Sequence, residues 1–211
     1  MRSQRSFLLP LAFLGLLAAV PARADGPRFE FTPFVGYRVG GGFDVEDDDG
    51  NDRGVDLDNG GGWGVDLGIY RDQSSFYELL YSTQEASVDS SDPELRGVDV
   101  TTQYYHVGGT LLFADERWAV PWLSLTIGAT EFSADGFDSE TKFSASLGGG
   151  LRLPFSDNFA ATLGLRGYLT FVDSDTDLLC YSGPTSGGCL LKSEGSSFIQ
   201  GEASLGLTLR F

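Results

Sequence analysis

The chain has few of the residues on which catalysis and nucleic-acid binding most often depend. It contains one histidine and two cysteines, and its 14 lysines and arginines are outnumbered by 30 aspartates and glutamates. A formal net charge of −16 would repel nucleic acid, so we expect no nucleic-acid partner. After residue 24 no segment has the apolar period of a helix, and 29 glycines are too many for a helical protein.

Long hydrophobic runs are also missing, apart from one near the N-terminus. Arg2 and Arg5 precede the apolar run from Phe7 to Val20, and the small residues of "ARA" at 22–24 follow it. This order is typical of a secretory signal peptide, which we predict over residues 1–24. An uncleaved anchor is the alternative, but the run is shorter than the roughly 20 residues of a spanning helix. Cleavage removes three arginines and no acid, and changes the formal charge to −19.

The mature chain, residues 25–211, alternates apolar and polar residues with a period of two, which is typical of β-strands. The final segment has apolar residues at every second position from Ala203 to Phe211, with Gly206 among the small or polar residues between them. Similar alternation occurs in eight segments: 28–44, 63–70, 77–82, 104–113, 122–129, 142–153, 159–171 and 201–211. The sequence therefore predicts an all-β domain of eight antiparallel strands.

The connections between these segments alternate between short and long. Tight turns are expected at 71–75, 114–117 and 155–158. The long connections, at about 45–58, 86–97, 133–140 and 174–196, carry most of the acidic residues, and we interpret them as solvated loops. An even number of strands joined in this way favours a closed barrel with one short rim and one elaborated rim.

Two kinds of closed barrel fit this pattern, and they differ in which face of each strand is buried. A soluble, lipocalin-like barrel holds its apolar face inside, whereas a membrane barrel turns that face to lipid. The polar face carries nearly balanced charges: Glu30, Asp66, Glu78 and Glu202 against Arg38, Lys142, Arg152, Arg166 and Arg210. A surface in contact with water would have little reason for that balance in so acidic a chain, so the pattern favours the membrane barrel.

Aromatic residues on the apolar face gather near the ends of the strands. Expected at the tight-turn end are Phe29, Phe31, Tyr77, Phe113, Phe159 and Phe211. Expected at the loop end are Tyr37, Phe43, Trp63, Tyr81, Phe143 and Phe171. Two such rings match the aromatic girdles of a membrane barrel, although scattered core aromatics are an alternative.

Several segments resemble one known family. "PFVGYRVG", "PWLSLTIGAT", "SLGGGLRLPFSDNFAATLGLRGYLTF" and the closing "LGLTLRF" are similar to the small eight-stranded outer-membrane barrels of Gram-negative bacteria, of the OmpA membrane-domain and OmpX type. The resemblance implies short periplasmic turns, long extracellular loops and surroundings of outer-membrane lipid and lipopolysaccharide. It also implies that Leu207, Leu209 and Phe211 form the signal read by the barrel-assembly machinery.

Catalysis is not expected. Lipid A deacylases on this fold use a histidine and a serine two residues later, but Gly108 follows the only histidine, His106, at that spacing. Palmitoyltransferase barrels need a histidine at the outer rim, and the sequence has none there. His106 lies in mid-strand on the polar face beside Tyr104, so we expect it to join a packing network, with no cofactor.

The charges of the polar face are expected to plug the lumen, because eight strands leave room only for side chains. We predict a network of Glu30, Arg38, Asp66, Glu78, His106, Arg152, Arg166, Glu202 and Arg210. Within it we expect Glu30 to pair with Arg210, and Arg166 with Glu202, because these residues lie on neighbouring strands. A network that opens to pass ions is the functional alternative.

Cys180 and Cys189 lie in the longest connection, on either side of "YSGPTSGG". Export would place them in an oxidising compartment, so we predict a disulfide between them.

The acidic segment "DVEDDDGND" at 44–52 raises the question of calcium binding. When Gly50 is aligned with the glycine of the twelve-residue calcium loop, Asp47 and Asp49 also fit. However, Val45 then stands at the first position, which needs a carboxylate, and Asp56 stands at the last, which is usually glutamate. We therefore predict no dedicated metal site, with simple solvation or a weak divalent site as the open alternatives.

Together these features predict a non-enzymatic outer-membrane barrel with a structural or surface-interaction role, such as membrane integrity or adhesion. A narrow porin-like conduit for small or hydrophobic solutes and a periplasmic soluble barrel that binds a ligand are the alternatives.

Overall fold

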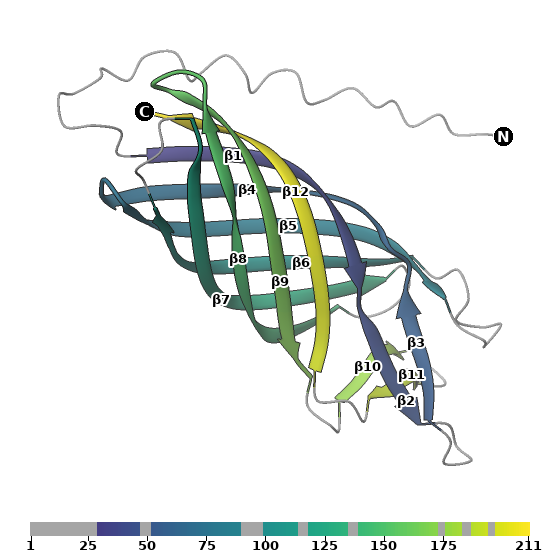
Figure 1. The fold of residues 1–211 in the computed structure, drawn as a ribbon. Helices are drawn as coiled ribbons and strands as arrows, with labels where there is room; N and C mark the ends of the chain where they lie inside the picture. Colours follow the sequence, from purple (N-terminus) through teal and green to yellow (C-terminus); the bar gives the residue numbers. More distant parts are fainter. Residues whose placement is uncertain are drawn as a thin grey trace, which may run out of the picture.

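The computed structural model describes residues 29–46, 52–89, 99–113, 118–134, 139–172, 176–182, 187–193 and 197–211, and within them the chain is built from β-strands (Figure 1). The strands are β1 (Phe29–Gly40), β2 (Gly42–Glu46), β3 (Asp52–Leu57), β4 (Gly60–Asp72), β5 (Ser75–Asp89), β6 (Asp99–Leu112), β7 (Val120–Ala134), β8 (Glu140–Pro154), β9 (Phe159–Phe171), β10 (Thr176–Ser182), β11 (Gly187–Ser193) and β12 (Ser197–Arg210). Among the described residues, no helix has the length and apolarity needed to cross a membrane. The predicted signal peptide lies outside them.

Eight strands form a closed antiparallel barrel, as the alternation predicts. The order around the wall is β1-β4-β5-β6-β7-β8-β9-β12, and β12 pairs with β1 to complete it. At the seam, the backbones of Phe29 and Phe211 exchange two hydrogen bonds of 3.0 Å. Closure leaves the barrel wall without an open edge.

The two faces of the wall confirm the inverted arrangement. Val35, Leu125 and Leu165 are 63%, 65% and 69% exposed on the outer face. Arg38, by contrast, is 0% exposed in the lumen, and most of the other inward side chains are polar. The soluble-barrel alternative is therefore wrong, because such a barrel would cover its apolar face and expose its polar one.

Exposed aromatic rings lie near both ends of the barrel. At the turn end, Phe29 stacks on Phe211 with ring centroids 6.3 Å apart. At the loop end, Phe143 stacks on Phe171 at 5.8 Å, and Trp63 meets the edge of Tyr81. Rings at both ends match the girdles predicted from the sequence. The side chain of Phe43 lies outside the described part.

Two of the four long connections contain strands where the sequence predicted solvated loops. The segment 45–58 contains much of the hairpin β2–β3, and 174–196 contains the hairpin β10–β11. Val45 of β2 pairs with Ser193 of β11, so the two hairpins belong to one sheet beyond the barrel (Figure 1). The prediction failed here because these strands are only 5 to 7 residues long, and pairing between distant hairpins leaves little period-two signal.

The first strand also ends earlier than predicted. Gly40 and Gly41 have φ angles of +80° and +104°, in the region that favours glycine, and they separate β1 from β2. Conversely, β5, β6 and β7 run several residues further toward the loop end than their periodicity indicates. Two predicted turns are confirmed, between β4 and β5 and between β8 and β9, whereas residues 114–117 lie outside the described part.

Candidate functional site in the barrel lumen

Among the residues that the structure describes, three buried ion pairs lie in the lumen, and together they form the candidate site. Nearest the loop end, Arg38 of β1 donates from Nε to Glu202 of β12 at 2.8 Å. The two residues are register partners on neighbouring strands. Ser82 accepts a hydrogen bond from Arg38 and donates one to Glu202 at 3.1 Å. The carboxylate therefore meets both a cation and a hydroxyl donor, as a buried charge requires.

Aromatic rings fill the lumen beside this pair. Tyr104 and Tyr168 stack at 4.0 Å between centroids with an interplanar angle of 19°. The guanidinium carbon of Arg38 lies 4.9 Å and 5.2 Å from the two ring centroids. The guanidinium therefore lies beside the tyrosine stack, and its Nη1 makes no hydrogen bond within the described structure.

The central pair spans the lumen. Glu78 lies on β5 and Arg166 on β9, four strands apart in either direction around the wall. Arg166 donates from Nη2 to Glu78 Oε1 at 2.6 Å, and from Nη1 to Ser146 at 3.0 Å. Glu78 also accepts hydrogen bonds from Thr110 and Ser124. The pair therefore links opposite sides of the barrel.

The third pair lies at the turn end. Arg152 of β8 donates to both carboxylate oxygens of Glu30 on β1, at 2.9 Å and 2.8 Å. Tyr70 donates to Glu30 at 2.6 Å, and the guanidinium carbon of Arg152 lies 5.5 Å from the centroid of Phe76. The bidentate geometry fixes the orientation of the arginine.

His106 is fully buried in the lumen, which agrees with the prediction that it joins a packing network. Its Nδ1 lies 2.9 Å from the hydroxyl of Thr126, and its Nε2 lies 2.8 Å from that of Ser144. Its ring also meets the edges of Tyr104 and Tyr168. Both nitrogens lie within hydrogen-bonding distance of hydroxyl groups, and neither is hydrogen bonded to a carboxylate in the part of the chain that the structure describes.

Both ion pairs predicted from the sequence are wrong in their partners. Glu30 and Arg210 face one another in the β1–β12 register, and so do Arg166 and Glu202 in the β9–β12 register. The side chains nevertheless bind elsewhere, with Glu30 on Arg152, Glu202 on Arg38 and Arg166 on Glu78. Arginine and glutamate are long enough to reach across a narrow lumen, so strand adjacency accounts for Arg38 with Glu202 but not for the other two pairs.

Neither Asp66 nor Arg210 is a member of these three ion pairs, although Asp66 lies beside Glu78 of the central pair. Asp66 lies on β4 within electrostatic range of Glu78 and Arg166, but its Oδ1 has no hydrogen-bond partner in the described structure. Arg210 is at the turn end, where its Nη2 lies 3.5 Å from the carbonyl oxygen of Ser156. Its predicted place in the ion-pair network is not observed.

Sequence reasoning assigned no role to the large inward side chains that complete the plug. Tyr70, Tyr104 and Tyr168 have the same parity as the lumen charges, and this is the signal that would have identified them. Near the loop end, Tyr104 donates to Gln200 at 2.9 Å, and Phe198 meets Phe132 edge to face. The plug is therefore both aromatic and ionic.

These contacts close the lumen at the level of the tyrosine stack. Arg38, Tyr104 and His106 are each 0% exposed, and Tyr168 is 1% exposed. An aqueous channel would wet the side chains that line it, whereas these four side chains are packed against their neighbours. Within the described residues, no cluster of three or more histidine, cysteine or carboxylate side chains is placed to hold a metal ion.

The remaining predicted sites are tested less directly. Cys180 lies opposite Cys189 in the β10–β11 register, but their side chains lie outside the described part, so the disulfide stays a prediction. The same holds for the acidic side chains of 44–56. Leu207 and Phe211 are exposed on the outer face and Leu209 is half-buried, and their role in assembly also stays a prediction.

Comparison with known proteins identifies the type of barrel. Residues 9–211 match the family described as "Outer membrane protein beta-barrel domain". The chain belongs to this family. Membership places the barrel in the outer membrane of a Gram-negative bacterium. No curated protein matches the chain.

Solved structures agree on the fold. Neisserial surface protein A (NspA) is 12% identical with a TM-score of 0.57, over 87% of this chain and 97% of that one. OprG from Pseudomonas aeruginosa is 12% identical with a TM-score of 0.57, over 89% and 97%. AlkL, solved in DMPC lipid bilayers, is 12% identical with a TM-score of 0.58, over 92% and 94%. At this identity the likeness concerns the fold alone.

Proposed function

We propose that this outer-membrane barrel is non-enzymatic and serves surface contact, with the barrel acting as a rigid membrane base. The observation that carries the proposal is the sheet beyond the loop end, in which β2–β3 and β10–β11 pair through Val45 and Ser193. It is also joined to the wall, because Leu57 of β3 pairs with Val88 of β5. A projection attached to the barrel in this way can hold a contact surface in place.

The chemistry of the projection supports a cationic partner. The segment from Asp44 to Asp58, which includes most of β2 and all of β3, is rich in carboxylates. In the orientation that the resemblance implies, this end faces the outside of the cell and the tight turns face the periplasm. NspA, which shares the fold, is named a surface protein. Acidic groups would strengthen contact with positively charged surfaces and speed the encounter.

The closed lumen argues against the conduit alternative. Passage of a solute would require the three ion pairs and the tyrosine stack to separate, and each buried charge would then lose its partner. We therefore expect planar bilayers that contain the purified barrel to remain silent, and liposomes that contain it not to swell in sugar solutions.

The experiment that tests the proposal compares the intact barrel with a variant in which residues 44–55 are replaced by a short Gly-Ser turn. Cells that lack the native gene would express either form and would be allowed to attach to polylysine-coated glass. We expect the intact barrel to increase attachment above that of cells that lack the gene, and the shortened variant to lose most of this increase. The variant should keep heat-modifiable gel migration, the sign of a folded barrel. Equal attachment by both forms, or steady conductance in bilayers, would overturn the proposal.

A further inference from the structure

Two carboxyl groups meet in the lumen of the barrel, Asp66 on β4 and Glu78 on β5. They lie within hydrogen-bonding distance of one another. An ionised carboxylate only accepts hydrogen bonds, so two of them cannot bind each other directly. The contact therefore requires a proton on one of the two groups, or a cation between them. The partners of each group indicate which of these holds.

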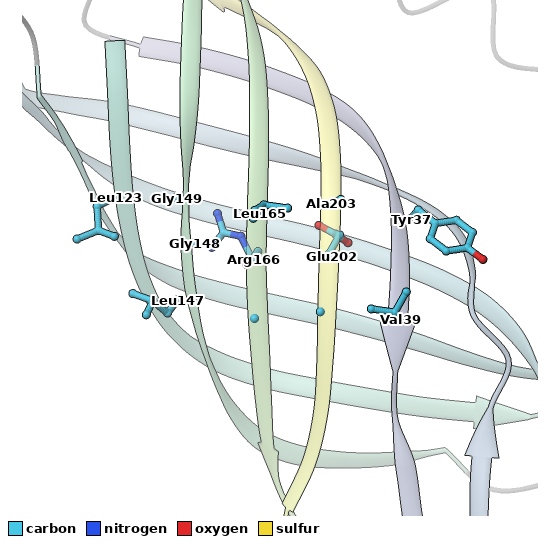
Figure 2. Close-up of a pocket in the computed structure, with 12 residues that line it drawn as sticks. Tyr37, Val39, Leu123, Leu147, Gly148, Gly149, Leu165, Arg166, Glu202 and Ala203 are labelled. Carbon is cyan, nitrogen blue, oxygen red and sulfur yellow. The ribbon is translucent and has the colours of Figure 1, made fainter. Parts of the chain in front are cut away.

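Glu78 has the partners of an ionised carboxylate. Arg166 follows the outward Leu165 on β9, so its side chain points into the lumen (Figure 2). There its Nη2 donates to Glu78 Oε1 at 2.6 Å. The hydroxyl groups of Thr110 and Ser124 donate to the other carboxylate oxygen of Glu78. These donors, one of them a cation, stabilise a negative charge on Glu78.

Asp66 lacks comparable donors. Its register partners on the two neighbouring strands are Thr32 and Leu80. The hydroxyl of Thr32 is hydrogen bonded to that of Thr208 at 2.8 Å, and Leu80 has no polar side-chain atom. In the part of the chain that the structure describes, Asp66 Oδ1 is buried without a hydrogen-bond partner, and no salt bridge joins Asp66 to an arginine. An ionised carboxylate here would be buried without compensation, which is unfavourable.

Aromatic rings flank Asp66 along its own strand. The inward positions on either side of it are Gly64 and Gly68. A Cβ atom at Gly64 would lie 2.3 Å from Cζ of Phe34, and a Cβ atom at Gly68 would lie 2.8 Å from Cδ2 of Phe76. The two rings therefore lie over these glycines, on both sides of the aspartate. Apolar neighbours favour the neutral form of a carboxyl group.

The charges that face Asp66 leave it without a counter-charge. Among the described residues, those that act on it most strongly are Glu78 on β5, Arg166 on β9 and Glu30 on β1. Arg166 binds Glu78, and Arg152 binds both carboxylate oxygens of Glu30. A proton on Asp66 makes this level of the lumen neutral, whereas an ionised Asp66 would add an unpaired negative charge.

We infer that Asp66 is a proton-binding site of the folded barrel, and that its protonated carboxyl group donates a hydrogen bond to the ionised Glu78. An aspartate in the unfolded chain is ionised at neutral pH, so the chain takes up this proton when it folds. The proton keeps the centre of the plug neutral. A neutral centre offers no favourable site to a permeating ion, which is consistent with the closed lumen.

Infrared spectroscopy of the barrel in detergent micelles at neutral pH detects the proton directly. The native barrel should show the carbonyl stretch of a protonated carboxylic acid, and Asp66→Asn should remove this band. Asp72→Asn is the matched control, because it changes an exposed aspartate in the turn between β4 and β5, and it should leave the band in place. In a pH-stat, refolding of the native chain from urea should take up about one proton more than refolding of Asp66→Asn. A native barrel without the band would overturn the inference.

Two amide variants determine which of the two groups carries the proton. Asparagine has the shape of a protonated aspartate and can donate a hydrogen bond, so Asp66→Asn should keep the native midpoint of unfolding in urea. Glu78→Gln leaves Arg166 without its counter-charge and should lower the midpoint. The opposite order would place the proton on Glu78 and overturn the inference. So would a midpoint of the native barrel that rises with sodium chloride but not with choline chloride, because a metal cation would then take the place of the proton.

Discussion

At the scale of single residues, the lumen of this barrel buries charged side chains that pair with one another. Arg38 has no exposed surface, and Glu202 is its ionic partner. The benefit of such a pair over apolar residues is small, but removal of one member leaves the other uncompensated. Single substitutions in the lumen should therefore have larger effects than their loss of contact area suggests.

Glu202→Ala should lower the free energy of unfolding by about 3–5 kcal/mol, because Arg38 then remains buried without a counter-charge. Unfolding by urea in detergent micelles, followed by tryptophan fluorescence, would measure this change. The double variant Arg38→Met with Glu202→Leu should recover most of the loss, since no charge is left in the lumen. An unchanged midpoint for Glu202→Ala would show that water reaches Arg38.

Two glycines on neighbouring strands should respond differently to alanine. A Cβ at Gly150 would lie 1.9 Å from the carbonyl oxygen of Leu163, so Gly150→Ala forces two paired strands apart. We expect it to lower the free energy of unfolding by about 1–3 kcal/mol in the same assay. Gly167→Ala, with open space at the Cβ position, should stay within about 0.5 kcal/mol of the native protein. Equal effects at both positions would contradict the close approach at Gly150.

At the scale of elements, the turn between β4 and β5 shows how a short connection is fixed. Asp72 accepts hydrogen bonds from the hydroxyl of Ser75 at 2.7 Å and from the backbone and hydroxyl of Ser74 at 2.8 Å and 2.9 Å. These bonds, with that from Ser75 the largest effect, lower the pKa of the exposed Asp72 from 3.8 to about 2. The turn therefore depends on the ionised carboxylate.

The stability of this turn should depend on acid pH in a defined direction. Because the pKa of Asp72 is lower in the folded state, its contribution is complete above pH 3.8 and is lost as pH falls toward about 2. Asp72→Asn should remove this part of the pH profile of the unfolding midpoint, and Ser75→Ala should reduce it. If both variants kept the native profile, other carboxylates would account for the acid sensitivity.

At the scale of the whole molecule, the apolar outer wall makes the fold dependent on its surroundings. The exposed leucines, valines and aromatic rings form a continuous band that water would not solvate favourably. We expect the mature polypeptide to fold only in the presence of detergent or lipid. A folded, monomeric protein in plain buffer, detected by circular dichroism and sedimentation, would contradict the membrane arrangement.

Orientation in the membrane can be tested with two exposed positions at opposite ends. In a background without native cysteines, Asn59→Cys lies at the loop end and Asp157→Cys lies in the turn between β8 and β9. A membrane-impermeant maleimide should label the former on intact cells, and the latter only after the outer membrane is permeabilised. The reverse pattern would place the acidic sheet in the periplasm.

The sequence by itself determined which residues share a face of each strand. A period of two fixes the parity of every residue in a regular strand, so Glu30 and Glu202 could be assigned to the polar face and Leu165 to the apolar face without coordinates. The same parity and the alternation of turns and loops predicted the eight-stranded barrel. Parity also marks Tyr104 and Tyr168 as inward, although their stacking does not follow from it.

Only the tertiary structure decided which inward residues bind one another. Closure brings β5 opposite β9, so Glu78 reaches Arg166 across the lumen, and this distance is not encoded along either strand. The pairing of Val45 with Ser193 likewise joins segments separated by most of the chain. Period and register act between neighbours, whereas contacts across a lumen depend on the curvature of the whole wall.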